Sequence, residues 1–403
     1  IFEGLEHLPA DVAVKGLTEV SRVLRPGAPL VITVPFKANY DDPTHLHYFT
    51  KSRLAKLIDE AGWRIARLER DTRRDAYRAH DLLVAVITNK KCEERRSLRI
   101  CALGDYRNRY NQLGYHWDGQ ARAFDSLGYD PLLLDIRRET HEYLKTAILD
   151  LKPDILWAGL EDCLPFIKSI SRELKSSGCT VVYWFGDLRE PKRRDLSGIV
   201  DFMFLTNRGQ LPEYKASYGI SNVFYMPQAC SPQFMFRREA TPEFDVGFLG
   251  DYRDLKWHSK RGEFLRRLER RYDCRFISTG VRNDVGEFYS KSRLALGLNP
   301  SVNVPDLYTS NRMYVALGCG ALYFCQRFPS MEEIAVPGKH VLCFEDAEEM
   351  EHIADRCLKE PEAAEEIRGA AMELAHSRHT YVHRVSNMLR IIGGESDGFE
   401  GFL

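Results

Sequence analysis

Short apolar runs with little polar alternation recur along residues 98–345, and helical stretches separate most of them. Such runs are typical of strands buried on both faces, as in a parallel sheet that helices cover on both sides. We therefore expect an α/β fold in this part of the chain. The expected strands are LRICALG (98–104), PLLLDI (131–136), PDILWAGL (153–160), TVVYWFGD (180–187), DFMFLTN (201–207), NVFYMPQA (222–229), FDVGFLG (244–250), CRFIST (274–279), YSKSRLALGLNP (289–300), LYFCQ (322–326) and HVLCFE (340–345).

The pentapeptide LGDYR closes the first strand of each half of this series, at Leu103–Arg107 and again at Leu249–Arg253. Chance identity or a shared turn preference would also explain so short a repeat. The apolar pattern favours two equivalent domains, because strands and helices follow each copy in the same order. We predict two doubly wound Rossmann-like domains in tandem, at residues 98–238 and 243–376, with a helix and tail over 377–403 that pack back on the first.

The first 91 residues carry a different pattern. A helical stripe ends at a Pro-Gly pair, an apolar strand follows, and Thr50 begins a second helical stripe that ends at Gly62. RIARLER then reads as an edge strand and HDLLVAVITNKK as one more strand. We expect the second half of an α/β sheet domain here, without its first half, joined to the rest by the charged linker KCEERRS.

Composition narrows the class of protein. The 403 residues suit two or three domains, and 44% hydrophobic with 29% charged residues is typical of a globular protein. A net charge of −1 provides no overall field for nucleic acid or an anionic membrane. No apolar run approaches the roughly 20 residues of a membrane span, and no signal peptide is recognisable. The ten cysteines are scattered without a C-x-x-C pair, which favours a reducing cytoplasm over a zinc site or a disulfide scaffold.

Residues 1–90 resemble the C-terminal half of class I S-adenosylmethionine-dependent methyltransferases. FEGLEHLPADVAVKGLTEVSRVLRPGAPLVITVPF and THLHYFTKSRLAKLIDEAGW carry the resemblance. The family binds its cofactor largely on a Gly-rich loop after the first strand and an acidic residue after the second, and this chain contains neither. We therefore expect no methyl transfer and no bound S-adenosylmethionine. Glu6 and His7 match the family's EH position, where we expect a polar pair at a sheet end without activity.

The segment from about residue 98 to 392 resembles GT-B glycosyltransferases, specifically the spore-maturation CgeB-like branch related to glycosyltransferase group 1. The resemblance implies a nucleotide-sugar donor of the UDP or GDP type held mainly by the C-terminal domain. It also implies a glycan, lipid-linked or protein acceptor facing the N-terminal domain, and no essential metal. The stretches that carry it are NVFYMPQACSPQFM, DVGFLGDYR, LALGLNPS, SNRMYVALGCGALYF, PSMEEIAVPGKHVLCFEDAEEMEHIADRCLKEP and SRHTYVHRV.

The donor site is expected at the carboxyl edge of the second sheet, where open parallel sheets bind ligands. Ser310 lies at the start of a predicted helix, whose free amides suit a diphosphate, and Arg312 adds a charge-assisted contact. A plain capped helix with a surface arginine is the alternative. The expected donor-binding residues are Gly250, Tyr252, Arg253, Ser278, Thr279, Gly280, Asn299, Ser310, Asn311, Arg312 and Glu333.

The chain departs from the family pattern R-x-x-E-A-L-x-x-G at one position. Its stretch RMYVALGCG has Val315 where the family often has a glutamate that binds the ribose hydroxyls of the donor. Either Glu332 or Glu333 supplies this carboxylate instead, or donor binding is weakened.

Glycosyl transfer also needs a base for the acceptor proton, or a substitution in which the donor phosphate accepts it. His116 precedes a predicted helix of the acceptor domain, and Asp187 in WFGDLR lies at the end of a predicted strand. These are the candidate catalytic residues. Asp105, Glu161 and Asp162 also follow predicted strands, where charged residues are common without being catalytic.

The sequence therefore predicts a cytoplasmic, metal-independent glycosyltransferase of hexosyltransferase type, fused to a truncated methyltransferase-like module and acting in polysaccharide biosynthesis. One alternative, motivated by Val315, is a degenerate GT-B protein that binds a sugar nucleotide or a partner without turnover. The other is the tail of a bifunctional methyltransferase–glycosyltransferase for a surface polysaccharide. The sugar, the acceptor and the stereochemical outcome stay open, with retention favoured by the family.

Overall fold

The computed structural model divides the chain into two compact units, residues 1–97 with 125–130, and residues 98–124 with 131–403. Each unit is described by itself. The described residues are 5–23, 29–35, 49–71, 82–89, 98–106, 116–192, 194–250, 259–277, 285–299 and 304–399.

The N-terminal unit contains a small sheet with two helices. Its elements are the 3-10 turn η1 (Leu5–His7), α1 (Ala10–Val23), β1 (Pro29–Pro35), α2 (Lys51–Glu60), β2 (Trp63–Asp71) and β3 (Leu82–Asn89). The Thr50 hydroxyl accepts a hydrogen bond from the Arg53 amide at 3.2 Å and so caps α2, as the sequence predicted. Trp63 is buried in the core, and its indole N–H donates to the Leu17 carbonyl of α1 at 3.1 Å.

The sheet of this unit differs from the predicted partial Rossmann-like module. Its order is β1-β3-β2, and β3 runs antiparallel to both neighbours. The reason lies in the connection between β2 and β3, which spans residues 72–81. A parallel pairing needs a crossover of about a dozen residues or more, usually with a helix, whereas a shorter link returns the chain antiparallel. The edge position predicted for β2 is confirmed.

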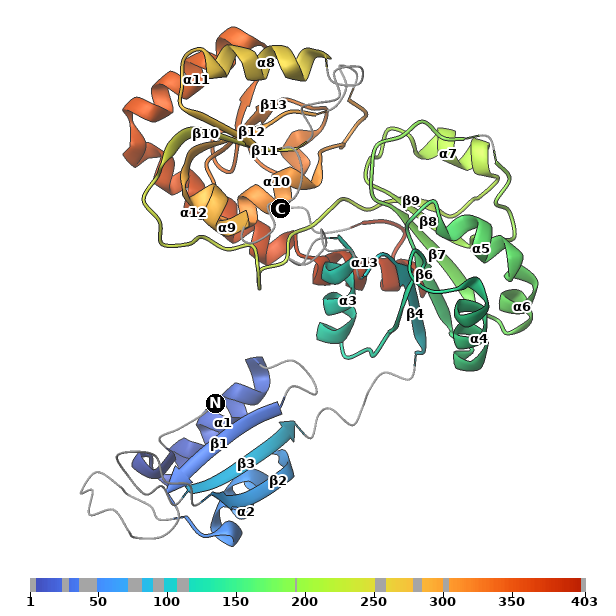
Figure 1. Cartoon of the computed structure of the whole chain (residues 1–403), viewed down its shortest axis with the longest axis vertical. Helices are drawn as coiled ribbons and strands as arrows, with labels where there is room; N and C mark the ends of the chain where they lie inside the picture. The colour runs from blue at the N-terminus through green and yellow to red at the C-terminus, as the bar shows by residue number, and fades with distance from the viewer. Residues whose placement is uncertain are drawn as a thin grey trace. The chain divides into compact units, whose positions relative to one another are not determined.

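The first lobe of the larger unit is built on a six-stranded parallel sheet of order β5-β4-β6-β7-β8-β9 (Figure 1). Leucine, cysteine and aromatic side chains on one face pack under α4, α5, α6 and α7. On the other face, Trp157 packs edge-on against Phe124 of α3, and Trp184 packs against Tyr381 of α13. The elements are β4 (Ile100–Gly104), α3 (His116–Ser126), β5 (Leu132–Asp135), α4 (His141–Leu151), β6 (Ile155–Ala158), α5 (Cys163–Ser169), α6 (Ser171–Ser176), β7 (Thr180–Phe185), β8 (Phe202–Leu205), α7 (Leu211–Tyr218) and β9 (Val223–Tyr225).

The second lobe repeats this plan with a five-stranded parallel sheet of order β11-β10-β12-β13-β14. Val246, Phe248 and Leu294 belong to the core layer under α8 and α11, whereas Ala295 and Tyr323 belong to the layer under α9, α10 and α12 (Figure 1). The elements are β10 (Phe244–Leu249), α8 (Ser259–Glu269), β11 (Cys274–Ile277), α9 (Val285–Ser290), β12 (Ser292–Gly297), α10 (Asn311–Gly318), β13 (Tyr323–Gln326), the 3-10 turn η3 (Met331–Glu333), β14 (Leu342–Phe344), α11 (Ala347–Lys359), α12 (Pro361–Arg378) and α13 (Tyr381–Ile392). The predicted α/β fold with two parallel sheets is confirmed.

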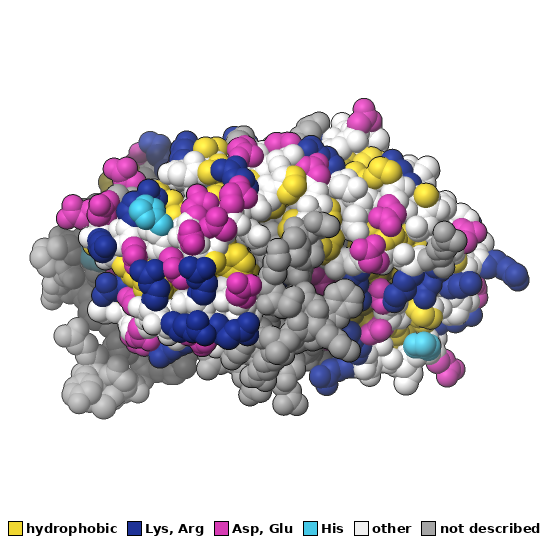
Figure 2. Space-filling model, turned by 90° about the horizontal axis from the view of Figure 1, so that it is seen from above, with side chains coloured by type: hydrophobic (Ala, Val, Ile, Leu, Met, Phe, Trp, Pro, Cys, Tyr) yellow, Lys and Arg dark blue, Asp and Glu magenta, His cyan; other side chains and the backbone are white. Residues whose placement is uncertain are grey.

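Charged side chains of both signs are interspersed over the face shown in Figure 2, in keeping with the net charge of −1. Among the described helices, none combines the length and the apolar character that crossing a membrane requires.

The chain crosses between the lobes twice, and the two crossings are bonded to each other. The first crossing follows β9, and the second precedes α13. The Cys230 amide donates to the His379 carbonyl at 2.8 Å, and the Tyr381 amide donates to the Cys230 carbonyl at 3.1 Å. Two segments far apart in the sequence thus form a short parallel bridge.

Arg384 of α13 ties these crossings together from inside the protein. Its side chain is fully buried, and Nε donates to the carbonyls of Pro227 at 3.1 Å and Gln228 at 3.0 Å. A terminal nitrogen lies 2.8 Å from Nδ1 of His379, whose Nε2 lies 3.1 Å from the Ile334 carbonyl. Burial lowers the pKa of His379 well below its usual value, and Arg384 lowers it further. The neutral imidazole therefore donates through Nε2 and accepts from Arg384 through Nδ1.

Replacing Arg384 tests this clasp. Arg384→Met keeps much of the side-chain volume but removes the donors to Pro227 and Gln228, whose carbonyls stay buried. We expect a loss of about 2–4 kcal/mol in the free energy of unfolding, measured by urea denaturation. Arg390→Met, on the same helix but partly exposed, is the control and should change it by less than about 1 kcal/mol. Equal effects of the two substitutions would contradict the clasp.

Candidate functional site

Strand order reverses at the same point in both lobes. In each sheet the second strand lies on one side of the first and the third strand on the other, so the chain reverses direction beside β4 and beside β10. Ligands of open α/β sheets bind outside the carboxyl ends of the strands at such a reversal. The two LGDYR copies occupy these positions, since Asp105 follows β4 and Gly250 follows β10.

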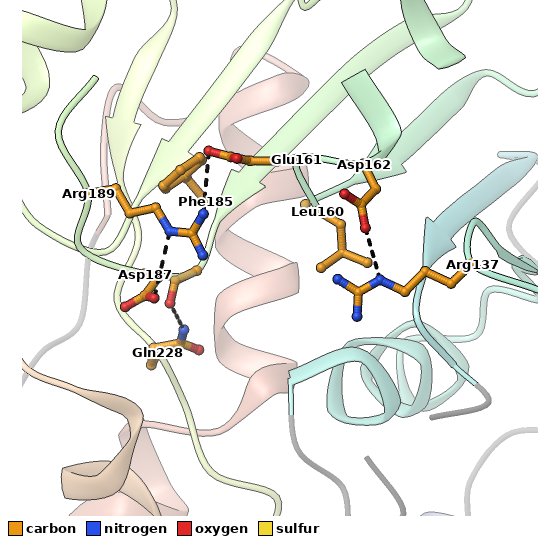
Figure 3. A pocket seen from close by; sticks show the side chains of 10 residues that line it. Arg137, Leu160, Glu161, Asp162, Phe185, Asp187, Arg189 and Gln228 are labelled. Carbon is orange, nitrogen blue, oxygen red and sulfur yellow. Dashed lines mark hydrogen bonds and ion pairs between the residues drawn. The ribbon is translucent and has the colours of Figure 1, made fainter. Parts of the chain in front are cut away.

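A pocket of about 360 Å³ lies at the carboxyl edge of the first sheet (Figure 3). Figure 3 shows Arg189, Asp187 and Gln228 on one side of it, and Arg137 with Asp162 on the other. Backbone of the loops after β6 and β7 completes the wall. The lining residues are Arg137, Gly159, Leu160, Glu161, Asp162, Phe185, Gly186, Asp187, Arg189 and Gln228.

Arg137 joins the two strand ends that flank the reversal in the first lobe. Its Nη1 lies 2.9 Å from Asp105 Oδ2 after β4, and its Nε lies 2.9 Å from Asp162 Oδ2 after β6. The hydrogen bond to Asp162 raises the pKa of Arg137, and the charge of Asp105 adds to the rise. The Asp105 carboxylate is 7% exposed, so this ion pair is largely shielded from water.

On the other side of the pocket, the ion pairs of Arg189 are longer than those of Arg137. Arg189 lies 3.5 Å from Glu161 and 3.9 Å from Asp187, whereas Lys192 Nζ approaches Glu161 Oε2 at 3.0 Å. The Gln228 amide donates to the Gly186 carbonyl, which fixes the loop that carries Asp187. Glu161 is thus already engaged by Lys192, whereas the ion pairs of the Arg189 guanidinium with described residues are longer than an ordinary hydrogen bond.

An arginine also lies at the reversal of the second lobe. Arg312 donates from Nε to the Leu249 carbonyl at the end of β10, and from Nη1 to the Leu298 carbonyl after β12 at 3.0 Å. Its guanidinium carbon lies 4.4 Å from the centre of the Phe248 ring. Arg261 of α8, which is buried, donates to the same Leu298 carbonyl at 3.0 Å. Two positive groups therefore meet where the carboxyl ends of β10 and β12 separate.

Gly250 leaves room for this arrangement. Its φ of +153° is one that side chains with a Cβ rarely adopt, and a Cβ there would collide with the Arg312 guanidinium. A glycine is therefore required between β10 and the arginine.

The start of α10 presents further polar groups to the same edge. Asn311 is its first residue, and the Asn311 Oδ1 atom is buried without a hydrogen-bond partner in the described part of the chain. Ser310 is the N-cap, and its hydroxyl accepts from Arg312 Nη1 at 3.3 Å. Asn299, after β12, is half-buried. The structure thus brings Asn299, Ser310, Asn311, Arg312 and Gly250 to one edge.

Tyr308 connects this edge with the pocket of the first lobe. It is 3% exposed, and burial raises its pKa. The carboxylate of Asp187 raises the pKa further, while Arg312 and Arg261 oppose the rise. Asp187 and both arginines therefore lie near enough to Tyr308 to act on its pKa.

Some predicted site residues cannot be placed in this geometry. Tyr252, Arg253, Ser278, Thr279 and Gly280 lie outside the described residues. His116 is the first residue of α3, and the structure does not describe its side chain. In the described part of the chain, no group of three or more His, Cys, Asp or Glu side chains is arranged to hold a metal ion.

Glu333 has a partner that the sequence did not predict. Arg208, after β8 of the first lobe, holds both of its oxygens, at 2.8 and 3.1 Å. The same guanidinium donates to Asp306 at 2.6 Å and to Ser330 at 3.3 Å. Hydrogen bonds to Asp306 and Glu333 raise the pKa of Arg208. Although burial acts in the opposite direction, the bonds from Arg208 and Ser330 leave the pKa of Asp306 below its usual value.

The structure also places Val315 and Glu332, the other two residues considered for the contact with the donor ribose. Val315 is buried in α10 among the residues of the second-lobe core. Glu332 is ion-paired with Arg327. Of the two glutamates that the sequence offered in place of Val315, Glu333 is the one held by the opposite lobe.

Sequence reasoning missed Arg137, Arg189, Arg208, Arg261 and Tyr308. Arg137 follows a predicted strand directly, so a rule that inspects every strand end for cations would have found it. Arg208 also follows a strand closely. Arg261 and Tyr308 give no such signal, because only the folded chain brings a helix and a long loop to the strand ends.

A double-mutant cycle tests the contact between the lobes. Arg208→Ala and Glu333→Ala should each destabilise the chain in urea denaturation, and the double variant should lose less than their sum. We expect a coupling of about 1 kcal/mol, since the partners are partly exposed. The control cycle pairs Arg208→Ala with Glu332→Ala and should be additive. Additivity with Glu333 as well would contradict the contact.

The similarity to a known protein family lies mainly in the second lobe. The family model described as "Glycosyl transferase-like" matches residues 260–390, within the second lobe and α13. None of the curated proteins matched the chain in a sequence comparison.

Two solved structures share the fold at low sequence identity. A glycosyltransferase from Rickettsia africae superposes with a TM-score of 0.53 at 10% identity, covering 74% of this chain and 100% of that one. Sucrose-phosphate synthase from Thermosynechococcus elongatus superposes with a TM-score of 0.51 at 10% identity, over the same shares. The second lobe is thus similar to a glycosyl transferase-like family, and the chain shares the fold of these two solved structures.

Proposed function

We propose that the chain transfers a sugar from a nucleotide-sugar donor, bound at the second-lobe edge, to an acceptor in the first-lobe pocket. The observation that carries this proposal is that the two lobes meet near their carboxyl edges. Arg208, which follows β8 of the first lobe, holds Asp306 and Glu333 of the second lobe. A transferase needs such proximity, because the acceptor oxygen must reach the anomeric carbon beside the leaving diphosphate.

The donor side offers the chemistry that a diphosphate requires. Arg312 and Arg261 supply positive charge, and the start of α10 adds backbone amides with the favourable end of the helix dipole. Asn311 Oδ1, which has no partner among the described residues, can accept from a donor hydroxyl. The remaining donor assignments, at Gly250, Tyr252, Arg253, Ser278, Thr279, Gly280, Asn299, Ser310 and Glu333, stay part of the proposal.

On the acceptor side, Asp187 is the proposed base. Its side chain is 65% exposed, it lines the pocket, and Arg189 lies beside it. A carboxylate in this position can accept the proton of the acceptor hydroxyl as the bond to the sugar forms. His116 is the second candidate for this role.

Binding without turnover is the competing function, and Val315 favours it. This buried side chain cannot contact a ribose hydroxyl by hydrogen bonding, and Arg208 occupies both oxygens of Glu333. A methyltransferase-like origin of residues 1–91, a CgeB-like branch, an absence of metal and a bifunctional parent enzyme for a surface polysaccharide remain predictions from the sequence.

Removing Arg312 tests the donor site. We expect Arg312→Ala to weaken the binding of UDP, GDP or dTDP, whichever the chain selects, by about tenfold to a hundredfold in calorimetric titrations. Arg270→Ala, an exposed arginine of the same lobe, is the control and should bind as the parent does. Tight nucleotide binding without sugar release from any nucleotide sugar, unchanged in Arg312→Ala, would support the binding protein instead.

Removing the charge of Asp187 tests the base. We expect Asp187→Asn to lower kcat by about a hundredfold to ten-thousandfold, while nucleotide affinity stays within about threefold. Asp150→Asn, on the exposed face of α4, is the control. A kcat that Asp187→Asn leaves unchanged would transfer the role to His116 or to the donor phosphate.

A further inference from the structure

We propose that the acceptor presents an uncharged, hydroxyl-rich sugar to the pocket after β6 and β7, and that Glu161, Asp162 and Asp187 exclude acidic sugars and phosphates. This inference rests on the proposed function and specifies the substrate class of its acceptor site. It starts from the charges of the lining, which comprise three carboxylates and two guanidinium groups.

The guanidinium that is held most firmly is unavailable to an anion. Arg137 is bonded to Asp105 and Asp162, at 2.9 Å in both cases. An anionic ligand could bind Arg137 only by displacing one of these carboxylates. Displacing Asp105 would break an ion pair of a carboxylate that is only 7% exposed, which is costly. Displacing Asp162 would leave a second negative charge beside the ligand.

Arg189, whose ion pairs are longer, cannot stabilise an acidic ligand either. Arg189 lies between Glu161 and Asp187, at 3.5 and 3.9 Å from their oxygens. An anion beside Arg189 would therefore also lie beside two carboxylates, which repel it at this range. A sugar hydroxyl meets no such conflict, because it can donate to a carboxylate and accept from Arg189 at the same time.

The rest of the lining also suits a sugar. Leu160 and Phe185 supply apolar surface for ring C–H groups, and the loop backbone at Gly159 and Gly186 supplies peptide groups. The pocket volume of about 360 Å³ lies near the lower end of the range of small-molecule sites, which suits one sugar unit.

Three ligands that share one ring and differ in charge test the proposal. Methyl glucoside, methyl glucuronide and glucose 6-phosphate are titrated against the full chain by saturation-transfer NMR, with the galactose series in parallel so that one hydroxyl configuration does not decide the result. We expect a neutral glycoside to bind about fivefold or more tighter than its acidic counterparts. Binding of the acidic ligands as tight as or tighter than that of the neutral ones, or binding of no ligand, would overturn the proposal.

A charge-neutral variant tests the stated cause. Glu161→Gln keeps the shape and an acceptor oxygen but removes one repelling charge, so the preference for the neutral sugar should shrink by about threefold to tenfold. Asp162→Asn provides a second variant, and thermal unfolding shows that each is folded. Glu173→Gln removes the same charge on α6, where Glu173 pairs with Lys145, and should leave the preference unchanged. An unchanged preference in both pocket variants would contradict the role of the carboxylates.

Nucleotide titrations separate this inference from the function on which it rests. If UDP, GDP and dTDP all fail to bind, the proposed function fails whatever the sugars do. If a nucleotide binds and acidic sugars are preferred, only the acceptor class is wrong.

Discussion

Parallel strands place all of their carboxyl ends at one edge of a sheet, and the reversal of strand order separates two of these ends. In both lobes an arginine spans that separation. Arg137 joins the aspartates that follow β4 and β6. Arg312 joins the carbonyl of Leu249, the last residue of β10, to the carbonyl of Leu298, which follows β12. The chemistry of the two bridges differs. Arg137 is neutralised by carboxylates, whereas Arg312 is held by carbonyl oxygens and keeps its positive charge for a ligand.

Under the proposed function, this difference suits the two edges to different ligands. An edge whose arginine is bound by peptide oxygens retains a net positive charge, as a diphosphate requires. An edge whose arginine is bound by aspartates is close to neutral or negative, as hydroxyl recognition requires. Both edges serve one reaction only if the lobes face each other, and the bonded crossings with the Arg384 clasp maintain that pairing. This arrangement buries the Arg384 guanidinium, whose hydrogen bonds go to carbonyl groups and to a neutral histidine rather than to a carboxylate of the described residues.

The sequence predicted the strands of both lobes because buried parallel strands are apolar throughout, and this pattern does not depend on long-range contacts. The position of Asp187 at the carboxyl edge could be predicted for a similar reason, since a charged residue at the end of such a strand must lie there. The sequence could not predict the antiparallel β3, because strand direction depends on the connection and not on the apolar pattern. The helical segment after β6 is divided at Ile170 into α5 and α6, and no local pattern marks that division. Arg208 and Glu333 are 125 positions apart, and no local signal connects residues at that separation.

The contact of Arg208 with Glu333 bears on how a donor would enter. If Glu333 replaces the ribose-binding glutamate that Val315 lacks, Arg208 must release both of its oxygens first. Arg208 would keep its bond to Asp306, so the guanidinium would retain one charged partner throughout the exchange. Because a charge-assisted bond would be exchanged for hydroxyl contacts at a partly exposed site, the net cost is small compared with breaking a buried pair. Donor binding and the contact between the lobes would then compete for the Glu333 carboxylate. The contact between the lobes would therefore be weaker when a donor is bound.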